Sequence, residues 1–311
     1  MKHSAAVVLA LSLLLGTHSA HSAQIARVTK KTPKPPQISS HTLAPRPICE
    51  AYAVADAADG RVLEGRNLQL RWPMASVTKL MLAMVVAEKI EAGELSLNDR
   101  VRVSRNAQGM GGTQVFLKAG EVFTLDEMMT AAMVESANDA SYAVAEHVGG
   151  TAAEFVRMMN RKAAALGMWD TEFHCPHGLP AKRGTAENLS TCLDLIQLAR
   201  EAAQHPQILE WTSIERTTFR NGTLAIHNHN KLLGVVPGVD GLKTGFTRRA
   251  GFNIVATGRN GDRRLIVVVL GSPESRVRNA LAIDKFQEHL IRMPIPVQAP
   301  EPEAKAEDFG G

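Results

Sequence analysis

The stretch that decides the fold is Met74-Ala75-Ser76-Val77-Thr78-Lys79-Leu80-Met81, which opens a strongly apolar run. Pro73 precedes this run and Gly93 follows it, so a helix of about 4–5 turns is predicted over 77–92. Ser76 lies in its first turn and Lys79 three residues later, which puts both side chains on one face. A serine hydroxyl needs a base beside it to act as a nucleophile, and a buried amine with a lowered pKa can be that base. Taken alone, the string also fits a capping serine followed by a solvated lysine.

A second polar string, Ser136-Ala137-Asn138, interrupts a helical region. Thr124 is a plausible helix cap with Glu127 at the capping-box position, and a helix is predicted over 124–133. A further helix is predicted over 140–147, so Ser136 and Asn138 are expected in a turn between helices. A serine there can relay a proton and an asparagine can bind a substrate amide, although both residue types also favour turns for purely local reasons.

The third string is Lys243-Thr244-Gly245, at the end of a predicted strand. Lys243 and Thr244 are suited to holding a carboxylate, and Gly245 lets the backbone pass close to a ligand. A second lysine close to Lys79 would also help to keep the Lys79 amine neutral. The ordinary alternative is a basic strand end with a glycine bulge.

The order of elements predicts an α+β fold in two lobes. Strands are expected at about 51–56 and 61–67, a mostly helical stretch follows over about 76–205, and a last helix is expected over 275–293. Between them, strands are expected near 215–220, 225–229, 239–244, 252–258 and 264–270. The terminal segments would then build one antiparallel sheet and the middle a helical lobe, with the site in the cleft between them. The glycine-rich segment 104–120 is expected either as a mobile loop on the rim of this cleft or as a plain connector.

The ordered strings S-x-x-K, S-x-N and K-T-G resemble those of the penicillin-recognising serine D-Ala-D-Ala carboxypeptidases, the low-molecular-mass penicillin-binding proteins of peptidase family S11. The resemblance covers roughly residues 47–293. Outside the three strings, it extends to Ala51–Asp56 with Gly60–Leu63, to His177-Gly178-Leu179, to Val239–Gly245 and to Arg264–Gly271.

The resemblance implies a serine β-lactamase-like fold and a role for each matched residue. Ser76 would be the acylated nucleophile and Lys79 its general base, with Ser136 completing the proton relay. The substrate-binding residues would be Asn138, Lys243, Thr244, Gly245 and Phe246. The backbone N–H groups of Ser76 and Phe246 would form the oxyanion hole. Several members of the family have a histidine where this chain has Phe246, which bears on substrate preference and deacylation rather than on the reaction class.

The implied reaction is removal of the terminal D-alanine from peptidoglycan stem pentapeptides through an acyl-enzyme, with β-lactams as covalent inhibitors and no cofactor. The alternatives are a D,D-endopeptidase that cuts cross-links and a non-catalytic protein that senses β-lactams or binds the cell wall. A β-lactamase is disfavoured because no E-x-x-x-N pattern surrounds Glu172 or Glu187 to supply a deacylating carboxylate.

The N-terminal end of the chain indicates an exported protein. Lys2 and His3 precede an apolar run and small residues, which predicts a signal peptide over 1–23. A flexible Pro/Lys-rich linker is predicted over 24–47, the D,D-peptidase domain over 48–293 and a disordered tail over 294–311. The tail has no apolar face, so no stable membrane anchor is expected, and the mature protein is expected to be soluble in the periplasm or outside the cell.

The composition excludes several other classes. The 311 residues carry a formal net charge of only +4, which does not indicate nucleic-acid binding. Histidines 174, 177, 227 and 229 lack the spacing of metal ligands, so no metal is expected. The three cysteines, Cys49, Cys175 and Cys192, are expected to be buried free thiols, with a Cys175–Cys192 disulfide as the alternative.

Overall fold

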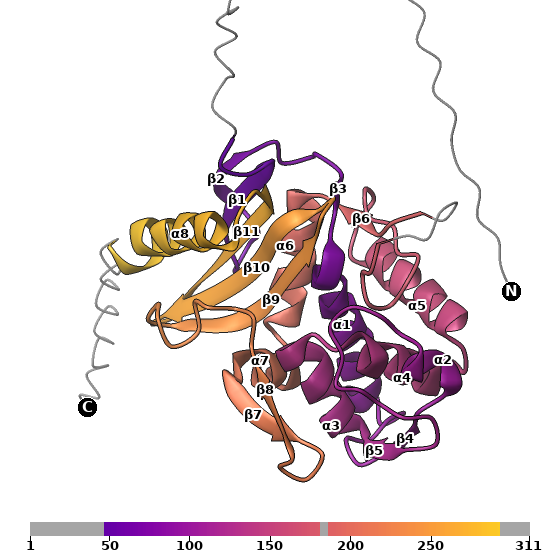
Figure 1. Cartoon of the computed structure of the whole chain (residues 1–311). Coiled ribbons are helices and arrows are strands. Elements are labelled where there is room, and N and C mark those ends of the chain that lie inside the picture. Colours follow the sequence, from indigo (N-terminus) through magenta and orange to yellow (C-terminus); the bar gives the residue numbers. More distant parts are fainter. Residues whose placement is uncertain (1–46, 181–185, 293–311) are drawn as a thin grey trace, which may run out of the picture. The chain divides into compact units, whose positions relative to one another are not determined.

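A five-stranded antiparallel sheet with the strand order β2-β1-β11-β10-β9 forms one lobe of the protein (Figure 1). The computed structural model describes residues 47–180 and 186–292. The strands of this sheet are β1 (Ala51–Asp56), β2 (Val62–Arg66), β9 (Val239–Thr247), β10 (Gly251–Asn260) and β11 (Arg263–Ser272). Strands β10 and β11 are joined by a two-residue turn, Gly261 and Asp262, in which Gly261 has φ of +59°; glycine at the first turn position is typical of tight hairpins.

Successive residues of β11 point to opposite faces of the sheet, and both faces are covered by apolar clusters. Val267 and Val269 belong to one apolar cluster, and Ile266 and Val268 belong to the other. The first face packs against α8 (Ser275–Phe286) and the π-helical turn Gln287–Ile291 that continues it. The second face packs against the helical lobe. A strand buried on both sides reads as a continuous β-branched run, as this one does.

The helical lobe surrounds α1 (Lys79–Glu91), which follows a 3₁₀ turn, η1 (Ala75–Thr78). Every residue of α1 from Lys79 to Ala87 is buried, so this helix forms the centre of the lobe. The helices around it are α2 (Arg105–Gln108), α3 (Leu125–Thr130), the π-helical turn η2 (Ala131–Glu135), α4 (Asn138–Gly149), α5 (Ala152–Ala165), α6 (Cys192–Ala202) and α7 (Pro206–Ser213).

Three pairs of short strands complete the fold. They are β3 (Trp72–Pro73) with β6 (Leu189–Ser190), β4 (Arg100–Arg102) with β5 (Val122–Thr124), and β7 (Arg216–Phe219) with β8 (Leu224–His227). The prediction that the later strands all join one sheet is wrong for β7 and β8, which pair only with each other. Alternating sequence identifies a strand, but it does not say which sheet the strand joins.

The local predictions around the site are largely confirmed. Thr124 caps α3, and both hydrogen bonds of the capping box with Glu127 are present. The helix predicted over 77–92 is present, but its first turn is the 3₁₀ turn that contains Ser76. Asn138 begins α4 instead of lying in the preceding turn.

The predicted signal peptide, the tail and all but the last residue of the linker lie outside the described residues. In the part of the chain that the structure covers, no helix has the length and apolar character needed to cross a membrane.

Candidate active site

The side chains of Ser76 and Lys79 meet at the start of the central helix. Lys79 is fully buried, and its Nζ lies 3.0 Å from Ser76 Oγ, 2.7 Å from Asn138 Oδ1 and 2.8 Å from the backbone oxygen of His177. A neutral amine has two N–H groups and one lone pair. When the amine is neutral, donation to the Asn138 and His177 oxygens leaves its lone pair to accept the proton of the Ser76 hydroxyl.

Two effects favour the neutral form of the Lys79 amine. Burial comes first and the nearby charge of Lys243 second, and together they lower the pKa of Lys79 well below its usual value. In the described structure Lys79 makes no ion pair with a carboxylate, so nothing in contact with it holds the proton in place. The arrangement is that of a base placed beside a hydroxyl nucleophile.

Lys243 supplies the second positive charge from strand β9. It is 1% exposed, and burial, with a smaller contribution from Arg278, lowers the pKa of Lys243 to about 7. Its Nζ donates to the Thr244 carbonyl oxygen at 3.3 Å. Among the described residues it has no hydrogen bond to Ser76 or Ser136, so it acts on Lys79 through its charge.

Ser136 lies where the π-helical turn η2 ends and α4 begins. Its backbone is left-handed, with φ of +66°, a conformation that costs energy for a non-glycine residue and that is common at functional sites. Its Oγ is buried and, within the described chain, has no hydrogen-bond partner. A buried hydroxyl without a partner is available to a ligand.

Asn138 and Asp139, the first two residues of α4, fix the loop on the rim of the site. Asn138 Nδ2 donates to the Gly111 carbonyl oxygen at 2.9 Å, while its Oδ1 accepts from Lys79. Asp139 is fully buried and accepts from the backbone N–H groups of Val115 and Leu117 at 3.2 and 3.0 Å. The rim predicted over 104–120 is thus tied to the helix that carries Asn138.

Gly245 allows strand β9 to run directly beside the turn that carries Ser76. A Cβ at this position would lie 2.7 Å from the Met74 carbonyl oxygen and 2.9 Å from the Ser76 backbone nitrogen. No side chain fits there without displacing backbone. Because β9 is the edge strand of the sheet, every second N–H along it is free of sheet pairing and can face the site.

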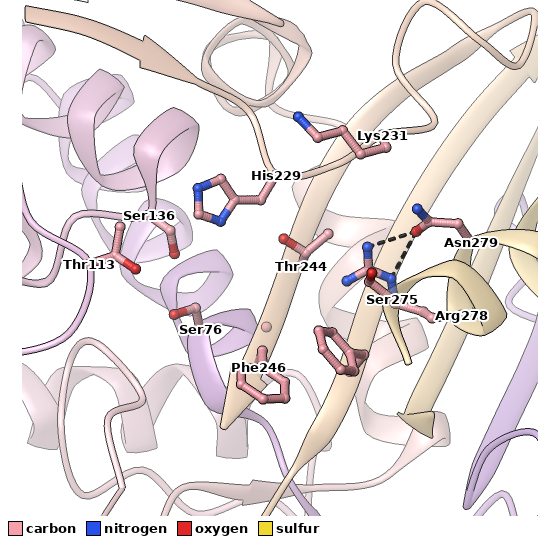
Figure 2. Close-up of a pocket in the computed structure, with 12 residues that line it drawn as sticks. Ser76, Thr113, Ser136, His229, Lys231, Thr244, Phe246, Ser275, Arg278 and Asn279 are labelled. Atoms are coloured by element: carbon pink, nitrogen blue, oxygen red, sulfur yellow. Dashed lines mark hydrogen bonds between the residues drawn. The ribbon is translucent and has the colours of Figure 1, made fainter. Parts of the chain in front are cut away.

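A cavity of about 390 Å³ lies between the helical lobe and the sheet (Figure 2). Ser76 and Ser136 lie at one end, Thr244 lies along its length, and Arg278 lies at the other end (Figure 2). Its remaining lining residues are Thr113, His229, Lys231, Gly245, Phe246, Phe252, Ser275 and Asn279.

Arg278, on α8, is a buried cation at the end of the cavity away from Ser76. It is 4% exposed and donates to Asn279 Oδ1 at 3.0 and 2.7 Å and to the Asn253 carbonyl oxygen at 3.2 Å. No carboxylate pairs with it in the described residues, and burial lowers the pKa of Arg278 to about 10. A buried, unpaired guanidinium beside a cavity favours an anionic ligand.

His229 reaches the cavity from the segment after β8, next to Ser136 (Figure 2). Its Nε2 lies 3.8 Å from Glu135 Oε1, and Glu135 Oε2 accepts from the His227 backbone at 3.0 Å. Burial and the charge of Lys243 lower the pKa of His229, which favours the neutral ring. Sequence reasoning found neither His229 nor Arg278 as a site residue, because no motif marks either position.

The residues that line the cavity include no cysteine and no member of an acid–histidine cluster. All three cysteines are free, and a Cys175–Cys192 disulfide is not formed. The expectation of buried thiols is confirmed for Cys49 and Cys192 but is wrong for Cys175, which is only partly buried. Two groups have metal-like spacing in the described chain: Glu64 with Glu288 and His289, and Glu88 with Glu201 and His205. In each group a carboxylate is already paired with a lysine, Glu64 with Lys285 and Glu88 with Lys162. The lysine therefore already balances the negative charge that would attract a metal ion.

Residues 38–274 match the family model described as D-alanyl-D-alanine carboxypeptidase, peptidase S11. The chain is 37% identical over 224 residues to the D-alanyl-D-alanine carboxypeptidase DacF of Bacillus subtilis, a match that covers 71% of this chain and 57% of the relative. It is 35% identical over 242 residues to DacC of Escherichia coli, covering 76% of this chain and 59% of the relative. The chain therefore spans somewhat more than half the length of these two curated relatives.

Solved structures show the same fold. Penicillin-binding protein 6B of Escherichia coli superposes with a TM-score of 0.71 at 33% identity, covering 79% of each chain. Penicillin-binding protein D2 of Listeria monocytogenes, in its ampicillin-bound form, gives a TM-score of 0.70 at 30% identity, covering 79% of this chain and 98% of that one. These likenesses confirm the two-lobe fold expected from the sequence.

Proposed function

Because this chain belongs to the D-alanyl-D-alanine carboxypeptidase family, peptidase S11, we propose that it is a serine-type carboxypeptidase that removes the terminal D-alanine from peptidoglycan stem peptides. One observation carries the proposal: the fully buried amine of Lys79 lies 3.0 Å from the hydroxyl oxygen of Ser76, within hydrogen-bond distance of the group that it would deprotonate.

In the acylation step, Lys79 accepts the hydroxyl proton while Ser76 Oγ bonds to the carbonyl carbon between the last two residues. The C–N bond then breaks, and the proton passes through the unpartnered hydroxyl of Ser136 to the departing amine. The products are D-alanine and an ester on Ser76. In deacylation, water attacks the ester carbon, its proton returns to Ser76 Oγ by way of Lys79, and the shortened peptide leaves.

The oxyanion of each tetrahedral intermediate would be held by the backbone N–H groups of Ser76 and Phe246. The close approach of β9 to the Ser76 turn at Gly245 supports this assignment, because it brings both backbones to the same side of the reacting carbon. Preorganised donors of this kind contribute strongly to acyl transfer, with losses of about 10²–10³ in kcat when one is removed.

The free carboxylate at the end of the peptide would bind to Thr244 and Arg278. Thr244 lines the cavity along β9, and Arg278 is the buried cation at its far end. Lys243 would add positive charge from β9, and Asn138 would contact the substrate amide. A substrate that ends in a carboxylate thus fits the cavity with its scissile bond above Ser76 and its charged end toward α8.

Three further proposals follow from family membership. β-Lactams would acylate Ser76, since relatives in this family have been solved with ampicillin and cefotaxime bound. Residues 48–293 would constitute the D,D-peptidase domain. The predicted signal peptide would direct export, so the substrate would be met outside the cytoplasm.

The direct test is release of free D-alanine from a stem pentapeptide by the full chain. The wild type should release D-alanine catalytically, and Ser76→Ala should release none while keeping the same circular dichroism spectrum and melting temperature. A stable β-lactam adduct on a wild type that releases no D-alanine would identify a sensor instead and overturn the proposal.

A second substrate separates the two hydrolytic activities of such a site. With isolated sacculi, a carboxypeptidase shortens pentapeptide stems and leaves cross-linked dimers intact. Loss of dimers with equal gain of monomers would show a D,D-endopeptidase instead.

A further inference from the structure

Two phenylalanine rings form an apolar wall of the cavity. Phe246 on β9 and Phe252 on β10 face each other directly in the antiparallel register. Their ring centroids lie 4.2 Å apart and the ring planes are inclined by 26°, so the rings are stacked. Phe246 keeps 53% of its surface exposed, although Phe252 supports it from one side.

Phe246 is exposed to the cavity itself. The described residues include six large apolar side chains that are exposed, and of these only Phe246 lines the cavity; the others are Ile48, Phe116, Trp169, Val235 and Ile291. An aromatic ring left uncovered in a concave site is a typical surface for an apolar ligand group.

The position of the pair along the cavity identifies which part of a substrate it meets. Strand β9 passes beside the turn that carries Ser76, β10 is the next strand, and α8 packs against β10 and β11. Arg278 on α8 donates to the Asn253 carbonyl oxygen of β10. Figure 2 shows Phe246 near Ser76, with Arg278 farther along the cavity. If the scissile bond lies at Ser76 and the terminal carboxylate at Arg278, the residue between them is the one that departs, and its side chain faces the two rings.

The chemistry of this wall differs from that of the wall opposite. Thr113, Ser136, His229 and Lys231 present polar groups, whereas Phe246 and Phe252 present only carbon. The cavity volume of about 390 Å³ lies within the range of pockets that hold whole small molecules, roughly 300–1,000 Å³. A methyl side chain would leave most of the Phe246 ring in contact with water.

We propose that Phe246 and Phe252 form a binding site for the side chain of the departing residue, and that the enzyme releases C-terminal D-residues with apolar side chains larger than that of alanine in preference to polar ones of the same size. This inference rests on the proposed carboxypeptidase function and names its substrate class. The bond changes are those of the proposed reaction, with the departing amine receiving the proton and water completing hydrolysis.

The test uses three stem pentapeptides that differ only in the last residue: D-alanine, D-leucine or D-asparagine. D-Leucine and D-asparagine have nearly the same shape, so their ratio of kcat/KM isolates the polarity of the subsite. The wild type should favour D-leucine over D-asparagine by at least about tenfold, the discrimination that a small change in an apolar pocket provides.

Phe246→Ala should bring this ratio close to one, and Phe246→Leu, which stays apolar, should keep most of it. Phe116→Ala is the matched control, because Phe116 is 68% exposed but does not line the cavity, and it should keep the wild-type ratio. Melting temperatures establish that each variant is folded, and Phe252→Leu gives a second variant of the same wall.

The outcomes separate the two proposals. Release of D-alanine with a leucine-to-asparagine ratio near one in the wild type, or with a ratio that Phe246→Ala leaves unchanged, would overturn the subsite while the carboxypeptidase stands. Failure of the wild type to release any of the three residues would overturn the carboxypeptidase itself.

Discussion

Lys79 is suited to act as a base because its helix is buried, and not because of a carboxylate or histidine partner. Its amine lies at the start of the buried central helix α1, close to a second buried lysine. Lys79 can act as a base only when it is neutral, whereas Lys243 must be charged to lower the pKa of Lys79. Raising the pH therefore increases the competence of Lys79 and, near the pKa of about 7 of Lys243, removes the second charge.

Acylation by a β-lactam should for this reason rise and then fall with pH. The acid limb reports Lys79, and the alkaline limb, beginning near pH 7, reports Lys243. Lys243→Arg keeps its charge throughout, since the pKa of arginine is above about 12, so its alkaline limb should move upward by at least one pH unit. Stopped-flow acylation rates between pH 5 and 10 provide the measurement. Lys231→Arg, which alters an exposed lysine of the same cavity, should keep the wild-type limb; an unmoved limb in Lys243→Arg would mean that another group titrates.

Ser136 is proposed to pass a proton to the departing amine, a need that depends on the leaving group. Ser136→Ala should lower kcat/KM by about 100-fold for a peptide, the usual scale for loss of a general acid. In a matched depsipeptide the last amide is replaced by an ester, so an alkoxide departs instead of an amine. Because an alkoxide needs less help from a proton donor to leave, the loss should be clearly smaller. Equal losses on the two substrates would show that the Ser136 hydroxyl binds the substrate and does not carry the proton.

At the scale of elements, the contact between β9 and the Ser76 turn is the feature that assembles the site. Gly245 permits it, because a Cβ there would meet backbone atoms of Met74 and Ser76 at 2.7 and 2.9 Å. Thr244 and Phe246 flank Gly245 on this strand. The distance between β9 and the Ser76 turn therefore determines the positions of both the proposed oxyanion hole and the proposed carboxylate site.

Gly245→Ala should therefore reduce the acylation rate by about 100-fold, comparable to loss of one oxyanion-hole donor. Gly111→Ala is the control, because a Cβ at Gly111 would meet no atom within 4 Å and its φ is not in the left-handed region. It should acylate at the wild-type rate. A fully active Gly245→Ala would show that β9 does not need to lie so close to Ser76. The comparison is made with a fluorescent penicillin under single-turnover conditions.

Several elements could be predicted from the sequence because their signals are local. The capping box at Thr124 and Glu127 and the serine-to-lysine spacing at Ser76 each depend on neighbours within a few residues. The π-helical turn before Ser136 could not be predicted, since the apolar spacing of the preceding helix continues through it. The separate pairing of β7 with β8 could not be predicted either, because alternation carries no information about sheet membership.

At the scale of the whole molecule, the cavity is a product of the two lobes together. Ser76 and Ser136 belong to the helical lobe, whereas Thr244, Phe246 and Arg278 belong to the sheet and its covering helix. The motif residues could be found from the sequence because each stands in a short recognisable string. Arg278 and His229 could not, since their roles arise only when segments distant in sequence are packed side by side.

The central claim is that Ser76 becomes covalently acylated because a neutral Lys79 lies beside it. The most direct measurement is the intact mass of the protein after incubation with benzylpenicillin, followed by peptide mapping of the adduct. We expect one equivalent of penicilloyl group, located on the peptide that contains Ser76, in the wild type, and none in Ser76→Ala. An adduct on a different peptide, or one that persists in Ser76→Ala, would contradict the account.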